Sequence, residues 1–199
     1  CWCDTPSPPA SPPTVASGAG DPHLVMAYGA TADFRGKDGE YFAMLSGPGI
    51  QFAMQTNDTV HLMNNKRSNW VHKMIHGSFF VAASFVLRDD SGEIHQVSAV
   101  ADHDAFVVDG QRITGGWRQW VARGVLISTR QVSMLVSTRG WNVTITRKPI
   151  FNKILGTSRK RFDFEVKPVR TNWTCFPQGV IGESFGGGVG VSGMQDDYT

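Results

Sequence analysis

The stretch WNVTITR (residues 141–147) places apolar and polar residues in strict alternation. Successive side chains of an extended chain point to opposite faces, so the apolar residues share one face and the polar residues share the other. The apolar face comprises Trp141, Val143 and Ile145, and the polar face comprises Asn142, Thr144 and Thr146. This pattern predicts a β-strand with one buried face and one solvated face.

Similar short runs, rich in β-branched and aromatic residues, lie on both sides of this stretch. They are YFAMLS (41–46), IQFAMQT (50–56), TVHLMNN (59–65), SFFVAASFVLRD (78–89), EIHQVSAVA (93–101), AFVVDGQRI (105–113), GVLISTRQVSMLVST (124–138) and RFDFEVKPV (161–169). Asp38-Gly39, Ser91-Gly92 and Asp109-Gly110 offer the positive φ that tight hairpin turns require. The sequence therefore predicts an all-β fold, an antiparallel sandwich or a twisted meander.

The composition of the 199 residues limits the classes of protein that fit. Hydrophobic residues make up 41% and charged residues 18%, which is enough apolar material for a sizeable core. The net charge of +2 argues against general nucleic-acid binding. No apolar run approaches eighteen residues, so we expect no membrane insertion by this segment. We also expect no cofactor.

The N-terminal residues 1–19 differ in composition from the rest of the chain. The stretch PSPPASPP (residues 6–13) fixes φ repeatedly and removes amide donors, which predicts an extended polyproline II arm, with a flexible linker as the alternative. Residues 20–199 then form one β domain. Its last stretch, from Gly179 onward, is rich in glycine and is expected to form a cap against the sheets.

Sequons and cysteines predict an extracellular location. Asn57, Asn142 and Asn172 each begin an Asn-X-Thr sequon. A bond from Cys1 or Cys3 to Cys175 would tie the arm to the body and leave one cysteine for a partner chain. Three free thiols, the alternative, suit a cytosolic protein better.

The order of several motifs resembles the von Willebrand factor type D domain. GDPH (residues 20–23), DFRG (33–36), YFAML (41–45), FVVDGQRI (106–113) and GVIGESF (179–185) resemble successive elements of that family. The cysteine-poor body is most similar to its root-cap, late-embryogenesis-like and inter-alpha-trypsin inhibitor heavy chain relatives. The Ser-Pro-Pro repeats resemble hydroxyproline-rich wall glycoproteins. The resemblance implies an antiparallel β-sandwich in a secreted assembly protein.

The resemblance also implies two kinds of chemistry. Some family members cleave themselves at the Asp-Pro bond, which would make Asp21 the nucleophile, Pro22 the leaving residue and His23 a proton donor. The interpretation we favour is a turn, ordered by Asp21 and fixed by Pro22. The family's calcium loop follows the closing motif, where this chain offers only Glu183, with Asp196 and Asp197 further on, so we expect no bound metal.

Other polar groups give weaker indications. ADHDAF (residues 101–106) is interpreted as a polar loop, and His72 and His76 as surface residues.

Eight basic and two acidic residues lie between positions 147 and 170. They predict either a surface strip that binds acidic polysaccharide or a solvated strand edge. The candidate residues for the strip are Arg147, Lys148, Lys153, Arg159, Lys160, Arg161 and Lys167.

These observations predict a non-enzymatic assembly module of an extracellular-matrix, cell-wall or cell-surface glycoprotein. Its expected partners are other extracellular glycoprotein subunits or copies of itself, in filaments among other assemblies. Binding of acidic polysaccharide and self-processing at Asp21-Pro22 are the two alternatives. A filament in images of the native material, retention on a polysaccharide column or a new N-terminus at Pro22 would distinguish the three.

Overall fold

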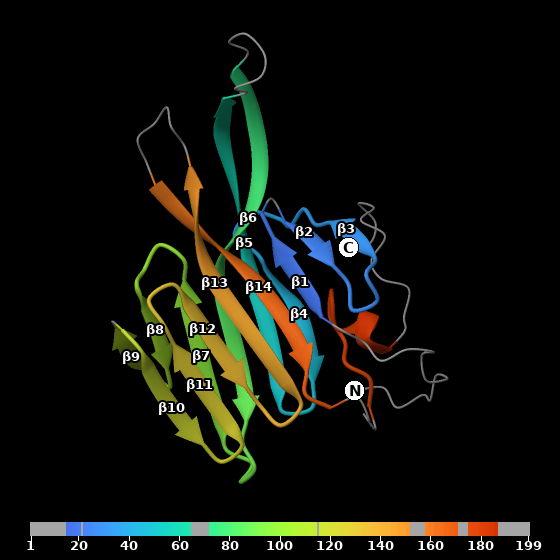
Figure 1. Cartoon of the computed structure of the whole chain (residues 1–199), viewed down its shortest axis with the longest axis vertical. Helices are drawn as coiled ribbons and strands as arrows, with labels where there is room; N and C mark the ends of the chain where they lie inside the picture. Colours follow the sequence, from blue (N-terminus) through green and yellow to red (C-terminus); the bar gives the residue numbers. More distant parts are fainter. Residues whose placement is uncertain are drawn as a thin grey trace.

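The computed structural model describes residues 15–20, 22–64, 72–114, 116–151, 158–170 and 175–186. Its elements are β1 (Ala16–Ala19), β2 (His23–Val25), β3 (Thr31–Asp33), β4 (Tyr41–Gly47), β5 (Ile50–Asn64), β6 (His72–Arg88), β7 (Ile94–Val100), β8 (Ala105–Val108), β9 (Gln111–Thr114), β10 (Arg118–Ala122), β11 (Val125–Thr129), β12 (Ser133–Ser137), β13 (Trp141–Phe151), β14 (Ser158–Pro168) and the short 3-10 helix η1 (Glu183–Gly186). The strands form two antiparallel sheets layered on one another (Figure 1), which confirms the all-β, sandwich-like fold. In this described part, no helix is long and apolar enough to cross a membrane.

One sheet has eight strands in the order β10-β11-β12-β13-β14-β1-β2-β3. The other has six strands in the order β4-β5-β6-β7-β8-β9. Within each sheet most neighbours are consecutive hairpins, and the pairing of β14 with β1 joins the two halves of the chain. The chain passes between sheets after β3 and after β9, so β9 and β10 end their sheets on the same side of the molecule (Figure 1).

The body begins earlier than the sequence indicated. Ala16–Ala19, which we assigned to the N-terminal arm, form β1 and pair with both β14 and β2. Gly18 allows this central position, because a Cβ there would come within 2.5 Å of the Phe164 ring. The proline-rich residues 1–14 lie outside the described residues.

The core lies between the sheets and follows the predicted alternation. Trp141, Val143 and Ile145 are each fully buried, as their spacing predicts. Aromatic rings from the two sheets meet across the layer: the centroids of Phe52 and Phe164 are 5.5 Å apart in an edge-to-face arrangement. Such pairs stabilise a core by about 0.5–1.5 kcal/mol beyond the burial of their surface.

The outer edge of β4 is covered by the segment that follows β14. The amide of Ser46 donates to the carbonyl of Gln178 at 2.7 Å, and the amide of Val180 donates to the carbonyl of Ala43 at 2.9 Å. Gly179 permits this approach, because a Cβ there would come within 2.7 Å of the carbonyl oxygen of Ala43 on β4. The described residues of the predicted C-terminal cap therefore lie against the six-stranded sheet.

Candidate functional site

The side of the molecule formed by β9 and β10 is open in the described part of the chain. Each of these strands pairs with a neighbour on one side only, β9 with β8 and β10 with β11. Apolar side chains are exposed here: Trp117 is 59% exposed, Val121 on β10 is 69% exposed, and Val132 is 56% exposed. We call strands β9 and β10 together with these three residues the open side. Unpaired backbone groups beside exposed apolar side chains are suited to the addition of another strand.

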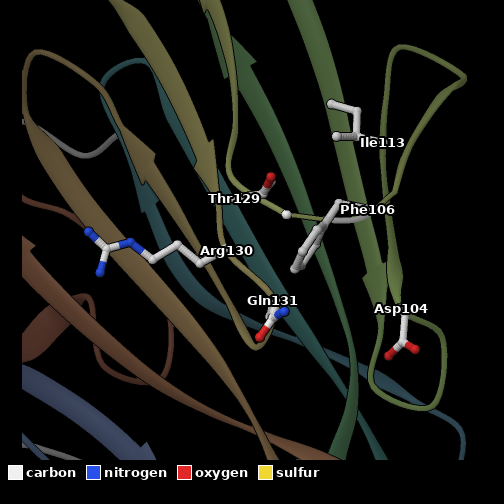
Figure 2. Close-up of a pocket in the computed structure, with 7 residues that line it drawn as sticks. Asp104, Phe106, Ile113, Thr129, Arg130 and Gln131 are labelled. Carbon is white, nitrogen blue, oxygen red and sulfur yellow. The ribbon is translucent and has the colours of Figure 1, made fainter.

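A pocket of about 300 Å³ lies on the same side, between β8–β9 and the turn that joins β11 to β12. Phe106 and Ile113 supply its apolar wall, and Thr129 and Gln131 face them from the other sheet (Figure 2). The remaining lining residues are Asp104, Gly116 and Arg130. The Arg130 side chain points away from Phe106 (Figure 2). The pocket combines the aromatic surface of Phe106 with polar groups of Asp104, Thr129 and Gln131. Such a pocket can hold an amphipathic side chain or a small molecule of that character.

Arg147 supports this pocket from the interior. Its guanidinium carbon lies 4.3 Å from the centre of the Phe106 ring. It donates hydrogen bonds to the carbonyls of Gln131 at 3.4 Å and Ala105 at 3.3 Å. Burial lowers the pKa of this guanidinium, and the charge of Asp104 opposes that shift. The side chain thus joins the two sheets at the base of the pocket.

The structure divides the predicted basic strip. Arg147 is only 5% exposed, so its prediction as a surface ligand for polyanions is wrong: it shares the inner face of β13 with Trp141. Lys160 pairs with Asp104 at 3.0 Å, and Arg161 pairs with Asp163 at 3.1 Å. Three other members are exposed, and one lies outside the described residues. The exposed members are Lys148, Arg159 and Lys167, and the undescribed one is Lys153.

The GDPH motif lies at the start of β2. Asp21 is outside the described residues, and Pro22 is buried, with its carbonyl accepting a hydrogen bond from the amide of Phe34 at 2.8 Å. His23 Nδ1 lies 2.5 Å from a carboxylate oxygen of Asp33, and both side chains are largely exposed. His23 is therefore the first residue of β2, and it pairs with Asp33 of the neighbouring strand β3 at an exposed position. The turn interpretation stays a prediction, because Asp21 is not described.

The other predicted site residues that the structure describes lie on different elements. Asn57 on β5 and Asn142 on β13 are half-buried, and Asn172 is outside the described residues. Cys175 is half-buried, and Cys1 and Cys3 are not described. Glu183 is exposed at the start of η1, and Asp196 and Asp197 lie outside the described residues. The loop interpretation of residues 101–104 agrees with the structure, where these residues form a turn before β8.

A cluster that the sequence analysis missed lies at the β6–β7 turn. Asp89, Glu93 and His95 each offer one ligand atom, and these atoms lie within 4.8 Å of one another. The spacing in DDSGEIH (residues 89–95) brings the two acids to either end of a tight turn, with His95 two residues beyond Glu93 on the same face. The fourth member, Asp109, comes from the β8–β9 turn and its Oδ2 lies 2.9 Å from His95 Nδ1.

The pKa values of His95 and Asp89 in this cluster are both shifted. Burial lowers the pKa of His95, but the hydrogen bond with Asp109 and the charges of Asp109, Glu93 and Asp89 outweigh it, so the net pKa is raised. The hydrogen bond from the Ser91 hydroxyl is the main cause that lowers the pKa of Asp89. Burial opposes this shift, and the amides of Glu93 and Ser91 reinforce it.

The chain was compared with models of known protein families, and none of them matches it. A comparison with curated proteins likewise gives no match.

Proposed function

We propose that this chain is a non-enzymatic assembly module of a secreted structural protein, and that a second copy of the chain adds to it at β10. The observation that carries the proposal is the open side, where β10 ends an eight-stranded sheet and Val121 is 69% exposed. Strand addition satisfies the free amides and carbonyls of an edge and covers the apolar side chains beside it.

The sequence of β10 suits antiparallel pairing with itself. If two copies align about Trp120, Arg118 of one faces Ala122 of the other and Gln119 faces Val121. In this alignment no like charges lie directly opposite one another. Like charges at opposite positions would destabilise the pair. The net charge of +2 is also too small for strong repulsion between copies. Pairing of this kind would join two eight-stranded sheets into one continuous sheet.

The extracellular part of the proposal rests on the sequence. Three sequons, the proline-rich arm and the resemblance to von Willebrand factor type D domains support a secreted matrix, wall or cell-surface protein. The arrangement of the basic residues favours assembly over polysaccharide binding. Arg147 is buried, and Lys160 and Arg161 have acidic partners, so these three residues do not form a continuous basic surface.

Sedimentation velocity over a range of concentrations tests the proposal. We expect the chain to associate with rising concentration and Val121→Lys to remain monomeric, because a lysine on an edge strand opposes pairing. Val100→Lys is the matched control, since Val100 is 43% exposed but lies on β7, which has neighbours on both sides. A chain that stays monomeric, or Val121→Lys that associates as the parent does, would refute assembly through this edge.

A further inference from the structure

The turn between β6 and β7 brings together more negative charge than its neighbours neutralise. Three carboxylates lie around the imidazole of His95: ligand atoms of Asp89 and Glu93 lie within 4.8 Å of a ring nitrogen, and Asp109 Oδ2 lies 2.9 Å from Nδ1. Among the described residues, the basic side chain that pairs with this turn is Arg139, and it binds the neighbouring Asp90 at 2.6 Å instead. The cluster therefore favours an additional cation.

The imidazole of His95 is fixed with one nitrogen directed at the cluster. His95 is 5% exposed, and its ring packs edge to face against Trp120 on β10, with 4.8 Å between the ring centres. Its Nδ1 lies 2.9 Å from Oδ2 of Asp109, whose other oxygen accepts the amide of Gln96 at 2.7 Å. Because an ionised carboxylate only accepts hydrogen bonds, the proton of the neutral ring resides on Nδ1. The lone pair of Nε2 is then available.

That Nε2 atom is buried and has no hydrogen-bond partner among the described residues. The distance from Nε2 to Oδ2 of Asp89 is 3.7 Å, which is too long for a hydrogen bond. Two ligands of one tetrahedral zinc ion, each about 2.0–2.2 Å from the metal, lie roughly 3.4 Å apart. A shift of a few tenths of an ångström would therefore bring these two atoms to ligand spacing.

Asp89 is held in an orientation that leaves Oδ2 for a ligand bond. Its Oδ1 accepts three hydrogen bonds, from the Ser91 amide at 2.8 Å, the Ser91 hydroxyl at 2.6 Å and the Glu93 amide at 2.9 Å. Glu93 is exposed, so its carboxylate can approach from the solvent side. A histidine that ligates a metal commonly donates its other ring N–H to a carboxylate, as His95 does to Asp109.

We propose that Asp89, Glu93 and His95 form a binding site for a divalent transition metal of the zinc type, with a fourth position open to water. One imidazole nitrogen with two carboxylates suits such an ion, whereas calcium and magnesium prefer oxygen ligands alone. The ion would connect the β6–β7 turn, through His95, to Asp109 of the β8–β9 turn and to Trp120 of β10. It would thus stiffen the open side. This site does not depend on the proposed assembly, because all of its ligands come from one chain.

Titration of the full chain with Co²⁺ and Zn²⁺, by absorption spectroscopy and chelator competition, tests the site. We expect one ion per chain at this site and at least tenfold weaker binding in Asp89→Asn and in Glu93→Gln. Asp90→Asn is the matched control: it changes the same turn in the same way, but its carboxylate pairs with Arg139. It should bind like the parent. Stoichiometric binding that neither Asp89→Asn nor Glu93→Gln weakens, or no binding by the parent, would overturn the proposal.

Nitrogen-15 NMR of the histidine side chains gives a second measurement that does not depend on how well the variants fold. In the metal-free parent we expect His95 to carry its proton on Nδ1 when neutral. Zinc should shift the Nε2 resonance of His95 and leave that of His23 unchanged. A neutral His95 protonated on Nε2, or an Nε2 resonance that zinc does not move, would overturn the assignment of His95 as a ligand.

Discussion

At the β4 edge of the sandwich a segment of the same chain supplies the missing hydrogen bonds, whereas at the β10 edge no described residue does so. Around the covered edge, the closing stretch GVIGESF (residues 179–185) buries Ile181 and Phe185 completely, and Phe185 packs edge to face on Trp141. Along the open edge, Val121 and Trp117 remain largely exposed. We call the covered edge, which consists of β4 with residues 178–185, the closed edge.

The contrast indicates different uses for the two edges. The closed edge contributes to the stability of the fold, because its side chains belong to the core. The pocket, the buried Arg147 and the His95 cluster lie close to the open side. The two edge strands of the open side, β9 and β10, are short. Changes at the closed edge should therefore alter stability, and changes at the open side should alter association or binding.

The largest effect is expected from Gly182→Val at the closed edge. A side chain at this position would collide with the backbone of Gln178, and the segment could no longer lie along β4. We expect a loss of about 3 kcal/mol or more in the free energy of unfolding, measured by urea denaturation. Gly140→Val is the control, because a Cβ at Gly140 has no neighbouring atom closer than 4.0 Å. Equal stability of the two variants would contradict our description of the closed edge.

A matched pair of truncations compares the two edges directly. Ile181→Ala removes methylene and methyl groups from a fully buried side chain and should destabilise the protein by about 2–4 kcal/mol. Val121→Ala should change the free energy of unfolding of the monomer by less than about 0.5 kcal/mol, since Val121 is mostly solvated. Thermal and urea unfolding at low concentration measure both. Similar losses in the two variants would remove the distinction between the edges.

A smaller effect is expected from Arg147→Lys beneath the pocket. Lysine keeps the charge but loses the planar fork that reaches both Gln131 and Ala105 and lies over Phe106. We expect a destabilisation of about 1–2 kcal/mol and faster amide exchange around the pocket. Lys148→Arg, on the opposite face of β13, should change neither quantity. Unchanged exchange in Arg147→Lys would show that the guanidinium does not join the sheets.

The smallest effect concerns the pH dependence of the Asp104–Lys160 pair. The hydrogen bond and charge of Lys160 are the main causes that lower the pKa of Asp104 below its ordinary value. A lowered folded-state pKa gives a contribution that is present above about pH 4 and is lost as the pH falls through the folded-state value. Asp104→Asn should therefore lose slightly less stability than the parent between pH 7 and pH 3. An identical loss in urea titrations would show that the pair contributes nothing measurable.

The sandwich was accessible from the sequence because its pattern is local. The alternation in WNVTITR shows which of its residues share the buried face and which share the solvated face. The glycine-containing turns separate successive strands. The same alternation also places Arg147 on the face of Trp141 and Ile145, so its burial followed from the pattern although a count of charges suggested a surface strip. The start of β1 was harder to predict, because Ala16–Ala19 are small residues that become a strand only between β14 and β2.

The His95 cluster depends on contacts that the sequence does not reveal. DDSGEIH brings two acids and a histidine close in sequence, but the orientation of the ring is set by Asp109, 14 positions away, through the pairing of β7 with β8. Trp120 comes from the other sheet altogether. The sequence drew attention to His23 instead, whose partner Asp33 is exposed with it. Burial, which distinguishes these two histidine–carboxylate pairs, follows from the tertiary fold.

Hydrogen–deuterium exchange of the backbone amides, measured at low and at high protein concentration, compares the two edges within one experiment. If a second copy adds at β10, the amides of residues 118–122 that do not bond to β11 should exchange rapidly at low concentration and become protected as the chain associates. The amides of β4 should be protected equally at both concentrations. Association that leaves the exchange of residues 118–122 unchanged, or protects another surface instead, would contradict the proposal that the open edge is the site of assembly.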